Sequence, residues 1–284
     1  MEHPTWIAVQ GIKTRYFDAG SGPPLVLLHG MSATAECWYY PFESLKNRFR
    51  VIAPDLPGHG RSARAERRQT LELYTEWLAA LFDALGVEHA VLVGNSMGGA
   101  ISMAFALTFP NRVDRLVLAA PALASARIDW LMPLRTLVRV PHLLAAVTTH
   151  RADPHYLRFV RRRLVFDPWG PAREPLERMI RTNAGRGLKV YRAGMDFLLS
   201  DYLPPHRRRA FVRHLAALRM PILLMWGRED RVLPVWQGIS AARSIPGARL
   251  HIFELCSHCP MMEVPIQFER VLLDFLQDND AAHP

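Results

Sequence analysis

Short apolar runs alternate along the chain with longer segments in which apolar residues recur every three or four positions. The short runs are typical of buried strands, and the periodic segments are typical of helices. The predicted strands cover residues 6–9, 12–18, 25–28, 50–53, 90–93, 116–120, 222–226 and 250–253. The predicted helices cover residues 40–47, 70–85, 100–109, 235–242 and 266–276. Because strands and helices alternate after an opening hairpin, we expect an α/β fold with a mostly parallel, doubly wound sheet.

This alternation stops between residues 122 and 220. The stretch predicts several helices joined by loops, and it is rich in arginine, proline and aromatic residues. We therefore expect a helical cap at residues 122–220, inserted into a core formed by residues 1–121 and 221–284. Open α/β sheets bind ligands outside the carboxyl ends of their strands, so an insertion that leaves this edge would roof the pocket.

The net charge is +9, and arginine carries nearly all of the positive charge, since lysine occurs only at Lys13, Lys46 and Lys189. Arginine clusters at residues 161–163 and 207–209 stand among apolar residues. That arrangement favours exposed helix faces over a nucleic-acid interface, so we expect no nucleic acid partner. A chain of 284 residues that is 50% hydrophobic is long enough for one α/β domain with an insertion.

The three cysteines, Cys37, Cys256 and Cys259, do not make a disulfide framework. Two of them flank His258, but two thiols and one imidazole leave a zinc ion without a fourth ligand, so we expect no metal and no cofactor. The start of the chain lacks the features of a signal peptide, and arginine and proline interrupt the apolar residues 130–148. We expect a cytoplasmic protein without a membrane span, and a homodimer is one assembly that the sequence leaves open.

The most informative motif is Gly94-Asn95-Ser96-Met97-Gly98, which follows a predicted strand and precedes a predicted helix. This is the G-x-S-x-G pattern of a nucleophile elbow, a sharp turn that exposes a serine hydroxyl. Glycine on each side of the serine lets strand and helix pass closely. The motif therefore predicts Ser96 as a covalent nucleophile.

A serine nucleophile needs a base and an acid that orients the base. In elbow enzymes these follow in the order serine, acid, histidine. Asp230 and His258 each follow a predicted strand in that order, and we expect them to be the acid and the base. Asp129 is a less favoured acid, Glu229 is expected to point elsewhere, and His251 is a poorer base because it lies inside a strand. Glu263 is expected to position the last helix rather than react.

The backbone amides of Met31 and Met97 are expected to bind the oxyanion, because both lie just beyond strand ends and Met97 opens a helix. Gly30 lets the backbone turn close to the substrate. His29 is expected to hold this loop. Residues 55–62 are expected to form a structural turn, with His59 at the surface or in the loop.

Together these segments resemble the α/β-hydrolase superfamily. The resemblance rests on His29-Gly30, residues 55–62, residues 94–99, residues 227–230 and Ser257-His258. It implies a mostly parallel eight-stranded sheet with a helical cap inserted after the sixth strand.

Within that superfamily, residues 94–99 are similar to the elbow of the meta-cleavage-product hydrolases, which cleave carbon–carbon bonds during aromatic degradation. The chain departs from their pattern in Ser257-His258-Cys259, where they usually have Gly-His-Trp, and in residues 31–34, where they have a glycine-rich loop. Their cap arginine binds the substrate carboxylate, a role that Arg178 or Arg181 would take here.

We expect a serine hydrolase that cleaves carboxylic esters of small to medium apolar or aromatic acyl groups. The acyl preference follows from apolar residues in the predicted cap, such as Trp130. Residues expected to contact substrate are Gly30, Asn95, Trp130, Arg178 and Arg181. Two alternatives remain: a hydrolase of carbon–carbon bonds in ring-fission products, and, less favoured, a non-catalytic ligand-binding module.

Overall fold

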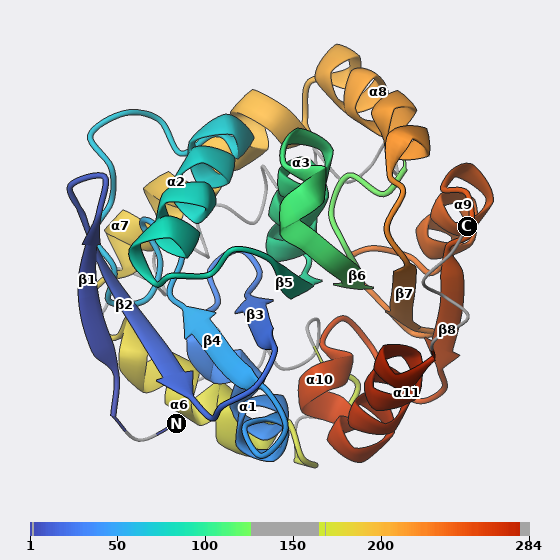
Figure 1. The fold of residues 1–284 in the computed structure, drawn as a ribbon, viewed down its shortest axis with the longest axis horizontal. Helices are drawn as coiled ribbons and strands as arrows, with labels where there is room; N and C mark the ends of the chain where they lie inside the picture. Colours follow the sequence, from blue (N-terminus) through green and yellow to red (C-terminus); the bar gives the residue numbers. More distant parts are fainter. Residues whose placement is uncertain (2, 126–164, 168, 279–284) are drawn as a thin grey trace.

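The computed structural model describes residues 1, 3–125, 165–167 and 169–278, and it contains an eight-stranded sheet in the order β1-β2-β4-β3-β5-β6-β7-β8 (Figure 1). The strands are β1 (Thr5–Val9), β2 (Ile12–Ala19), β3 (Pro24–Leu28), β4 (Arg50–Pro54), β5 (Ala90–Asn95), β6 (Val113–Ala119), β7 (Ile222–Gly227) and β8 (Arg249–Phe253). Strand β2 runs antiparallel to β1 and to β4, and all other neighbours are parallel. The predicted mostly parallel sheet is confirmed.

Helices cover both faces of this sheet, as a doubly wound fold requires (Figure 1). The first face carries α2 (Leu71–Ala84), α3 (Met97–Thr108) and α9 (Trp236–Ser244). The second face carries α1 (Tyr39–Leu45), α10 (Pro260–Glu263) and α11 (Pro265–Gln277).

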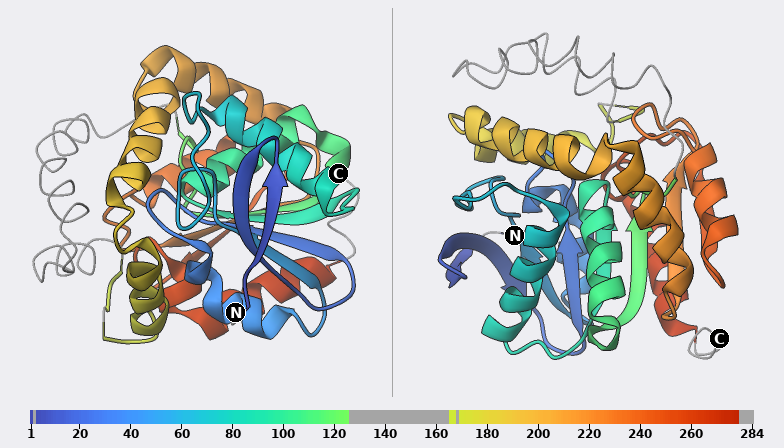
Figure 2. Two further views of the ribbon diagram at one scale, coloured as in Figure 1. Left: turned by 90° about the vertical axis from the view of Figure 1, so that its left-hand side faces the viewer. Right: turned by 90° about the horizontal axis from the view of Figure 1, so that it is seen from above.

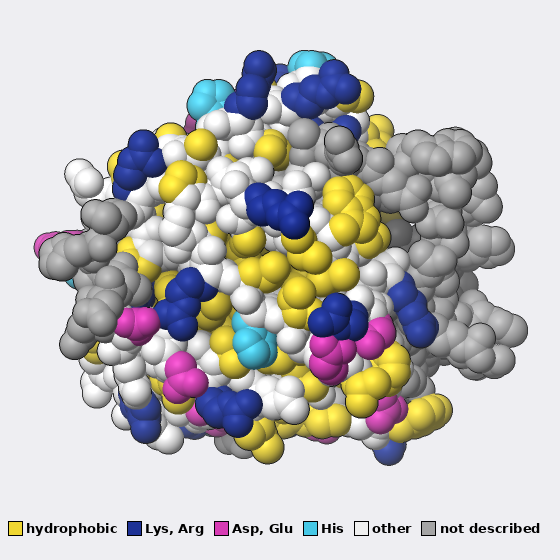
Figure 3. All heavy atoms as spheres, turned by 90° about the vertical axis from the view of Figure 1, so that its right-hand side faces the viewer, with side chains coloured by type: hydrophobic (Ala, Val, Ile, Leu, Met, Phe, Trp, Pro, Cys, Tyr) yellow, Lys and Arg dark blue, Asp and Glu magenta, His cyan; other side chains and the backbone are white. Residues whose placement is uncertain are grey.

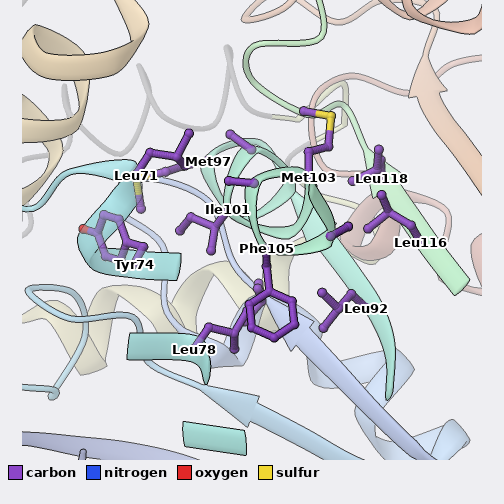
Figure 4. Packing of buried hydrophobic residues seen from close by; sticks show 14 of the residues in the cluster. Leu71, Tyr74, Leu78, Leu92, Met97, Ile101, Met103, Phe105, Leu116 and Leu118 are labelled. Carbon is purple, nitrogen blue, oxygen red and sulfur yellow. The ribbon is translucent and has the colours of Figure 1, made fainter. Parts of the chain in front are cut away.

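The strands divide the core into two layers because successive side chains point to opposite faces. In β3, Val26 and Leu28 pack toward α2 and α3, whereas Leu25 and Leu27 pack toward α1 and α11. Phe105 of α3 belongs to the first layer and is fully buried there (Figure 4). Burying one such side chain contributes about 2–3 kcal/mol. The two packed layers hold the strand ends, and the loops that follow them, in fixed positions.

Between β6 and β7 the described chain is helical. It contains α6 (Arg173–Asn183), α7 (Gly187–Phe197), the π-helix η3 (Leu198–Tyr202) and α8 (Pro205–His214). Figure 2 shows α6 and α7 crossing the molecule beyond the carboxyl ends of the strands. The helical insertion expected there is present, while its limits at 122 and 220 stay predictions because residues 126–164 lie outside the described part.

Side chains of the insertion bind the segment that connects β4 to α2. The Asp196 carboxylate accepts a hydrogen bond of 3.1 Å from the Gln69 amide and pairs with Arg64, and Asp201 accepts one of 2.9 Å from the Leu71 amide. Carboxylates that accept backbone N–H groups satisfy donors that would otherwise be left unpaired at a helix start. Helix α7 and η3 are therefore fixed to the core by polar contacts.

The predicted elements all appear, with ends that differ by a few residues. Helix α3 begins at Met97, directly after the nucleophile, rather than at residue 100, and β6 begins at Val113 rather than at residue 116. Gly98 and Gly99 have low helix propensity, so the apolar periodicity that predicted the helix body begins only at residue 100. The four-residue helix α10 was not predicted.

Charged residues are dispersed over the face of the molecule that Figure 3 shows. On the face shown in Figure 3, basic side chains stand among acidic, apolar and other residues. Arg228 pairs with Glu254, and Arg249 pairs with Asp278. Among the described helices, none has the length and apolar character needed to cross a bilayer.

Candidate active site

Ser96 occupies a strained turn between β5 and α3. Its backbone has φ +53° and ψ −116°, a combination that L-residues other than glycine rarely adopt. The Ser96 amide donates to the Ala119 carbonyl at 3.0 Å, and the Ser96 carbonyl accepts from the Ala122 amide at 2.9 Å. The end of β6 and the loop that follows it thus hold the strained residue from both sides, as a nucleophile elbow requires.

The two glycines of the motif are needed for close packing. A Cβ atom at Gly98 would lie 2.2 Å from the Leu28 carbonyl oxygen, and one at Gly94 would lie 2.5 Å from the Gly98 carbonyl oxygen. No real Cβ approaches a backbone oxygen so closely, so any larger residue would push α3 away from the strands. The close approach brings the serine to the carboxyl edge of the sheet.

His258 and Asp230 form a buried pair at the same edge. The His258 Nδ1 atom lies 2.8 Å from Asp230 Oδ2, and the two side chains are almost completely buried. The other carboxylate oxygen, Oδ1, accepts hydrogen bonds of 2.8 Å from the amides of Val232 and Leu233. Glu229 points elsewhere, as predicted, and accepts a hydrogen bond from the Cys256 amide at 2.9 Å. The carboxylate is thus oriented to hold the imidazole by Nδ1, which leaves Nε2 as the ring atom that can accept a proton.

Asn95 connects the elbow to the histidine loop. It was expected to contact substrate, but its side chain is buried and its amide donates to the carbonyls of Ala119 at 3.0 Å and His258 at 3.1 Å. Both donors of the amide are used by the protein. These contacts favour a positioning role over direct substrate binding.

The loop after β3 approaches the nucleophile. A Cβ atom at Gly30 would lie 3.1 Å from Ser96 Cβ, which is tighter than ordinary van der Waals contact, so a side chain there would press on the elbow. His29 holds the loop as predicted, because its Nε2 accepts from the Leu56 amide at 3.0 Å and its Nδ1 lies 2.8 Å from the Gly30 carbonyl. Burial lowers the pKa of His29, which favours the neutral ring that this pattern requires.

Sequence reasoning missed the cap residues that support the same loop. The Asn183 amide donates to the Ser32 carbonyl at 3.0 Å, and the Thr182 hydroxyl donates to the Glu36 carboxylate at 2.8 Å. Burial tends to raise the pKa of Glu36, but the hydrogen bond and charge of Arg15 outweigh it and lower that pKa. No motif marks residues 182 and 183, since their partners lie about 150 positions away in the sequence.

The predicted structural turn at residues 55–62 is built around Asp55, which accepts hydrogen bonds from the amides of Ala35 and Arg61 and pairs with Arg15 at 3.0 Å. The expectation that His59 is a surface or loop histidine is wrong with respect to exposure, because its side chain is fully buried. The α7 helix packs on the neighbouring Gly58, where a Cβ atom would lie 2.5 Å from Ala193 Cβ. The sequence pattern does not indicate which helix packs on this turn.

The two arginines expected to bind substrate have acidic neighbours on their own helix. Arg178 Nε donates to Glu174 at 2.8 Å and stacks over the Tyr39 ring, with 4.3 Å from Cζ to the ring centroid. Arg181 lies 3.9 Å from Glu177 and is exposed. A substrate contact of Arg178 or Arg181 therefore stays a prediction. Trp130 and the alternative acid Asp129 lie outside the described residues.

The cysteines near the site are buried thiols. Burial is the largest cause of the raised pKa of Cys37, Cys256 and Cys259, and it makes them poor nucleophiles. Within the described part of the chain, no group of three His, Cys, Asp or Glu side chains is arranged to hold a metal ion. Ser96 is therefore the group at this edge with the geometry of a nucleophile.

Comparison with known proteins gives concordant matches over nearly the whole chain. A family model described as alpha/beta hydrolase fold matches residues 23–265. A 2-hydroxy-6-oxo-6-phenylhexa-2,4-dienoate hydrolase from Comamonas testosteroni is 31% identical and is matched over 93% of this chain and 91% of its own length. The structure of a thermophilic esterase from Thermogutta terrifontis is similar with a TM-score of 0.77 and 26% identity, covering 97% of this chain and 98% of that one. A meta-cleavage product hydrolase from Pseudomonas fluorescens IP01 gives a TM-score of 0.73 and 26% identity, covering 96% and 97%.

Proposed function

Because this chain belongs to the alpha/beta hydrolase fold family, we propose that it is a serine hydrolase that cleaves carboxylic esters through an acyl-enzyme on Ser96. The observation that carries the proposal is the buried 2.8 Å contact between His258 and Asp230, at the sheet edge where the elbow holds Ser96 in its strained conformation. A base that is oriented by a buried carboxylate, at the sheet edge that also carries a partly buried serine, is suited to nucleophilic acyl transfer.

In the proposed reaction the Ser96 hydroxyl oxygen attacks the ester carbonyl carbon while His258 Nε2 takes the hydroxyl proton. The carbonyl oxygen becomes an oxyanion, and Asp230 stabilises the imidazolium. His258 then gives the proton to the departing alkoxide, and an alcohol leaves. A water molecule repeats the sequence on the acyl-enzyme, which releases the acid and regenerates the serine.

The oxyanion is expected to be bound by the backbone amides of Met31 and Met97. Met97 is the first residue of α3, and its N–H is one of those that cannot bond within the helix. Met31 follows Gly30, which lies against the elbow. Two fixed donors at the developing charge lower the barrier by about 3 kcal/mol each.

The substrate is expected to carry a small to medium apolar or aromatic acyl group. The composition of residues 130–144, which contain tryptophan and several leucines, supports an apolar acyl site. The similarity to the Thermogutta esterase supports ester cleavage.

A second candidate is hydrolysis of a carbon–carbon bond in a ring-fission product. The 31% identity to the Comamonas dienoate hydrolase specifically favours it. The same nucleophile, base and acid would serve, and a cap arginine such as Arg178 would bind the substrate carboxylate.

A substrate panel tests both candidates: p-nitrophenyl esters of increasing acyl length beside a ring-fission dienoate. We expect ester turnover that Ser96→Ala abolishes, while the exposed control Ser244→Ala keeps it. Dienoate turnover without ester turnover would replace the first candidate by the second. Wild-type rates in Ser96→Ala would refute both.

A further inference from the structure

Glu263 is a buried carboxylate at the end of α10, with 8% of its surface exposed. The sequence predicts only that it positions the last helix. In the structure it contacts the loop that carries His258: Oε1 accepts from the Cys259 amide at 3.0 Å, and both oxygens lie within 3.2 Å of the Ser257 amide. The carboxylate therefore binds the backbone immediately before and after the histidine.

The same carboxylate also binds the chain that returns from the cap. Its Oε2 accepts a hydrogen bond of 2.5 Å from the Phe166 amide. The Oε1 atom therefore binds the histidine loop, and the Oε2 atom binds the segment that returns from the cap. The Ser257 amide lies within hydrogen-bond distance of both oxygens. One buried side chain connects the cap segment to the catalytic loop.

The charge of Glu263 is placed to act on His258. The pKa of Glu263 is raised, because burial outweighs the opposing influence of the three amides and of the charge of His258. Hydrogen bonds donated to a carboxylate favour its ionised form. The other titratable groups around this loop are Asp230, which holds the imidazole, Glu229, which binds the Cys256 amide, and the protonated thiols of Cys256 and Cys259.

We propose that Glu263 is a positioning residue for His258: its two oxygens fix the histidine loop against the segment returning from the cap, and its negative charge stabilises the imidazolium formed during attack. The inference rests on the proposed function, because it assigns His258 the role of the base. The hydrogen bonds of Glu263 described above go to the amides of Ser257, Cys259 and Phe166.

The variant Glu263→Gln separates these contributions from simple packing. Glutamine keeps the size of the side chain but has one acceptor oxygen, and its NH₂ group would face a backbone N–H on the other side. One of the two partners then loses its hydrogen bond, and the negative charge is gone. The labelling rate of Ser96 should fall at low pH as His258 becomes protonated, and this part of the pH profile is called its acid limb. In Glu263→Gln the acid limb should move to lower pH, because the imidazolium is less stabilised.

The experiment measures the rate at which a fluorophosphonate probe labels Ser96 as a function of pH, together with thermal unfolding. We expect Glu263→Gln to label about tenfold more slowly or worse, with its acid limb shifted down by about half a pH unit or more. The control Glu254→Gln, which removes an exposed carboxylate after β8, should keep the wild-type profile.

An unchanged acid limb in a folded Glu263→Gln protein would overturn the proposal, whether or not the rate falls, because a purely structural residue has that signature. If Glu263→Gln does not fold, Glu263→Asp replaces it, because aspartate keeps the negative charge on a shorter side chain. A wild-type labelling rate in Glu263→Asp would also overturn the proposal. A slower rate with an unchanged acid limb in Glu263→Asp would support the proposal. Failure of the wild-type protein to react with the probe would contradict the proposed function itself.

Discussion

The side-chain amide of Asn95 donates a hydrogen bond of 3.1 Å to the backbone carbonyl of His258. Asn95 ends β5 immediately before Ser96, whereas His258 lies in the loop after β8, at the far edge of the sheet. The same amide donates to Ala119 at the end of β6. The relative position of the nucleophile and the expected base therefore depends on a side chain that is neither of them.

Asn95→Leu should lower kcat by about tenfold to a hundredfold, because a small displacement of the base costs that much. Leucine has the same number of side-chain heavy atoms but cannot donate, so the His258 carbonyl loses its hydrogen bond from Asn95, whereas the Ala119 carbonyl keeps the one from the Ser96 amide. The free energy of unfolding should fall by about 2 kcal/mol. Steady-state kinetics and urea unfolding measure both effects. The exposed Asn111→Leu is the matched control, and equal kinetics in the two variants would show that the Asn95 contact is dispensable.

Asp230→Asn should reduce kcat by about 10³–10⁴-fold with little loss of stability. The amides of Val232 and Leu233 both donate to Oδ1, so the asparagine oxygen should occupy that position and its NH₂ group should face His258 Nδ1. The ring would then accept at Nδ1 and carry its proton on Nε2, which is the wrong tautomer for a base.

Kinetics and thermal unfolding of Asp230→Asn, compared with the exposed Asp274→Asn, check this expectation. Activity within tenfold of the wild type would mean that Asp230 does not orient the base.

Gly98→Ala should destabilise the protein much more than Gly86→Ala. The new methyl group at position 98 would lie 2.2 Å from the Leu28 carbonyl oxygen and 2.6 Å from that of His29, so α3 and β3 would have to separate, at a cost of about 3 kcal/mol. Gly86 has open space around it but φ +64°, so only the backbone strain of about 1 kcal/mol applies. Urea unfolding ranks the two variants, and equal losses would show that the helix–strand approach is relaxed in solution.

The sequence predicted those parts of the site that depend on local order along the chain. Ser96, Asp230 and His258 each follow an apolar run, and parallel strands bring their carboxyl ends to one edge, so strand order and spacing were sufficient to nominate them. The burial of His59 and the contacts of Glu263 and Asn183 were not predictable in this way. They depend on which distant segment covers a loop, and that is decided by packing between core and cap rather than by periodicity.

Stability should fall as the pH drops from 7 to 5, in part because of His59. Burial and the neighbouring His29 lower the pKa of His59 to about 3, so the folded protein keeps this ring neutral while the unfolded chain protonates it below about pH 6.5. The unfolded state then binds more protons, and the contribution lost by pH 5 is about 2 kcal/mol.

His59→Phe should reduce that loss. The ring fits a similar volume, and the Pro57 carbonyl that His59 contacts also accepts from the Tyr74 hydroxyl at 3.2 Å. Urea unfolding at pH 7 and pH 5 measures the difference, with the exposed His206→Phe as a control. The same pH sensitivity in wild type and His59→Phe would contradict the assignment.

Lys189 should produce a pH dependence of the same sign in the alkaline range. Its ammonium on α7 donates to the carbonyls of Gly60 at 2.8 Å and Ser62 at 2.7 Å, and burial lowers its pKa to about 8. Between that pH and about 10.5, the unfolded chain holds a proton that the folded protein has released, so folding is favoured increasingly as the pH rises.

Lys189→Met removes the titrating group, and its stability should therefore fall further behind that of the wild type at pH 9.5 than at pH 7.5. Urea unfolding at the two pH values tests this against the exposed Lys13→Met. A constant difference between wild type and Lys189→Met would mean that the ammonium is solvated, and α7 would then have to be held to the core by Asp196 and its partners without help from Lys189.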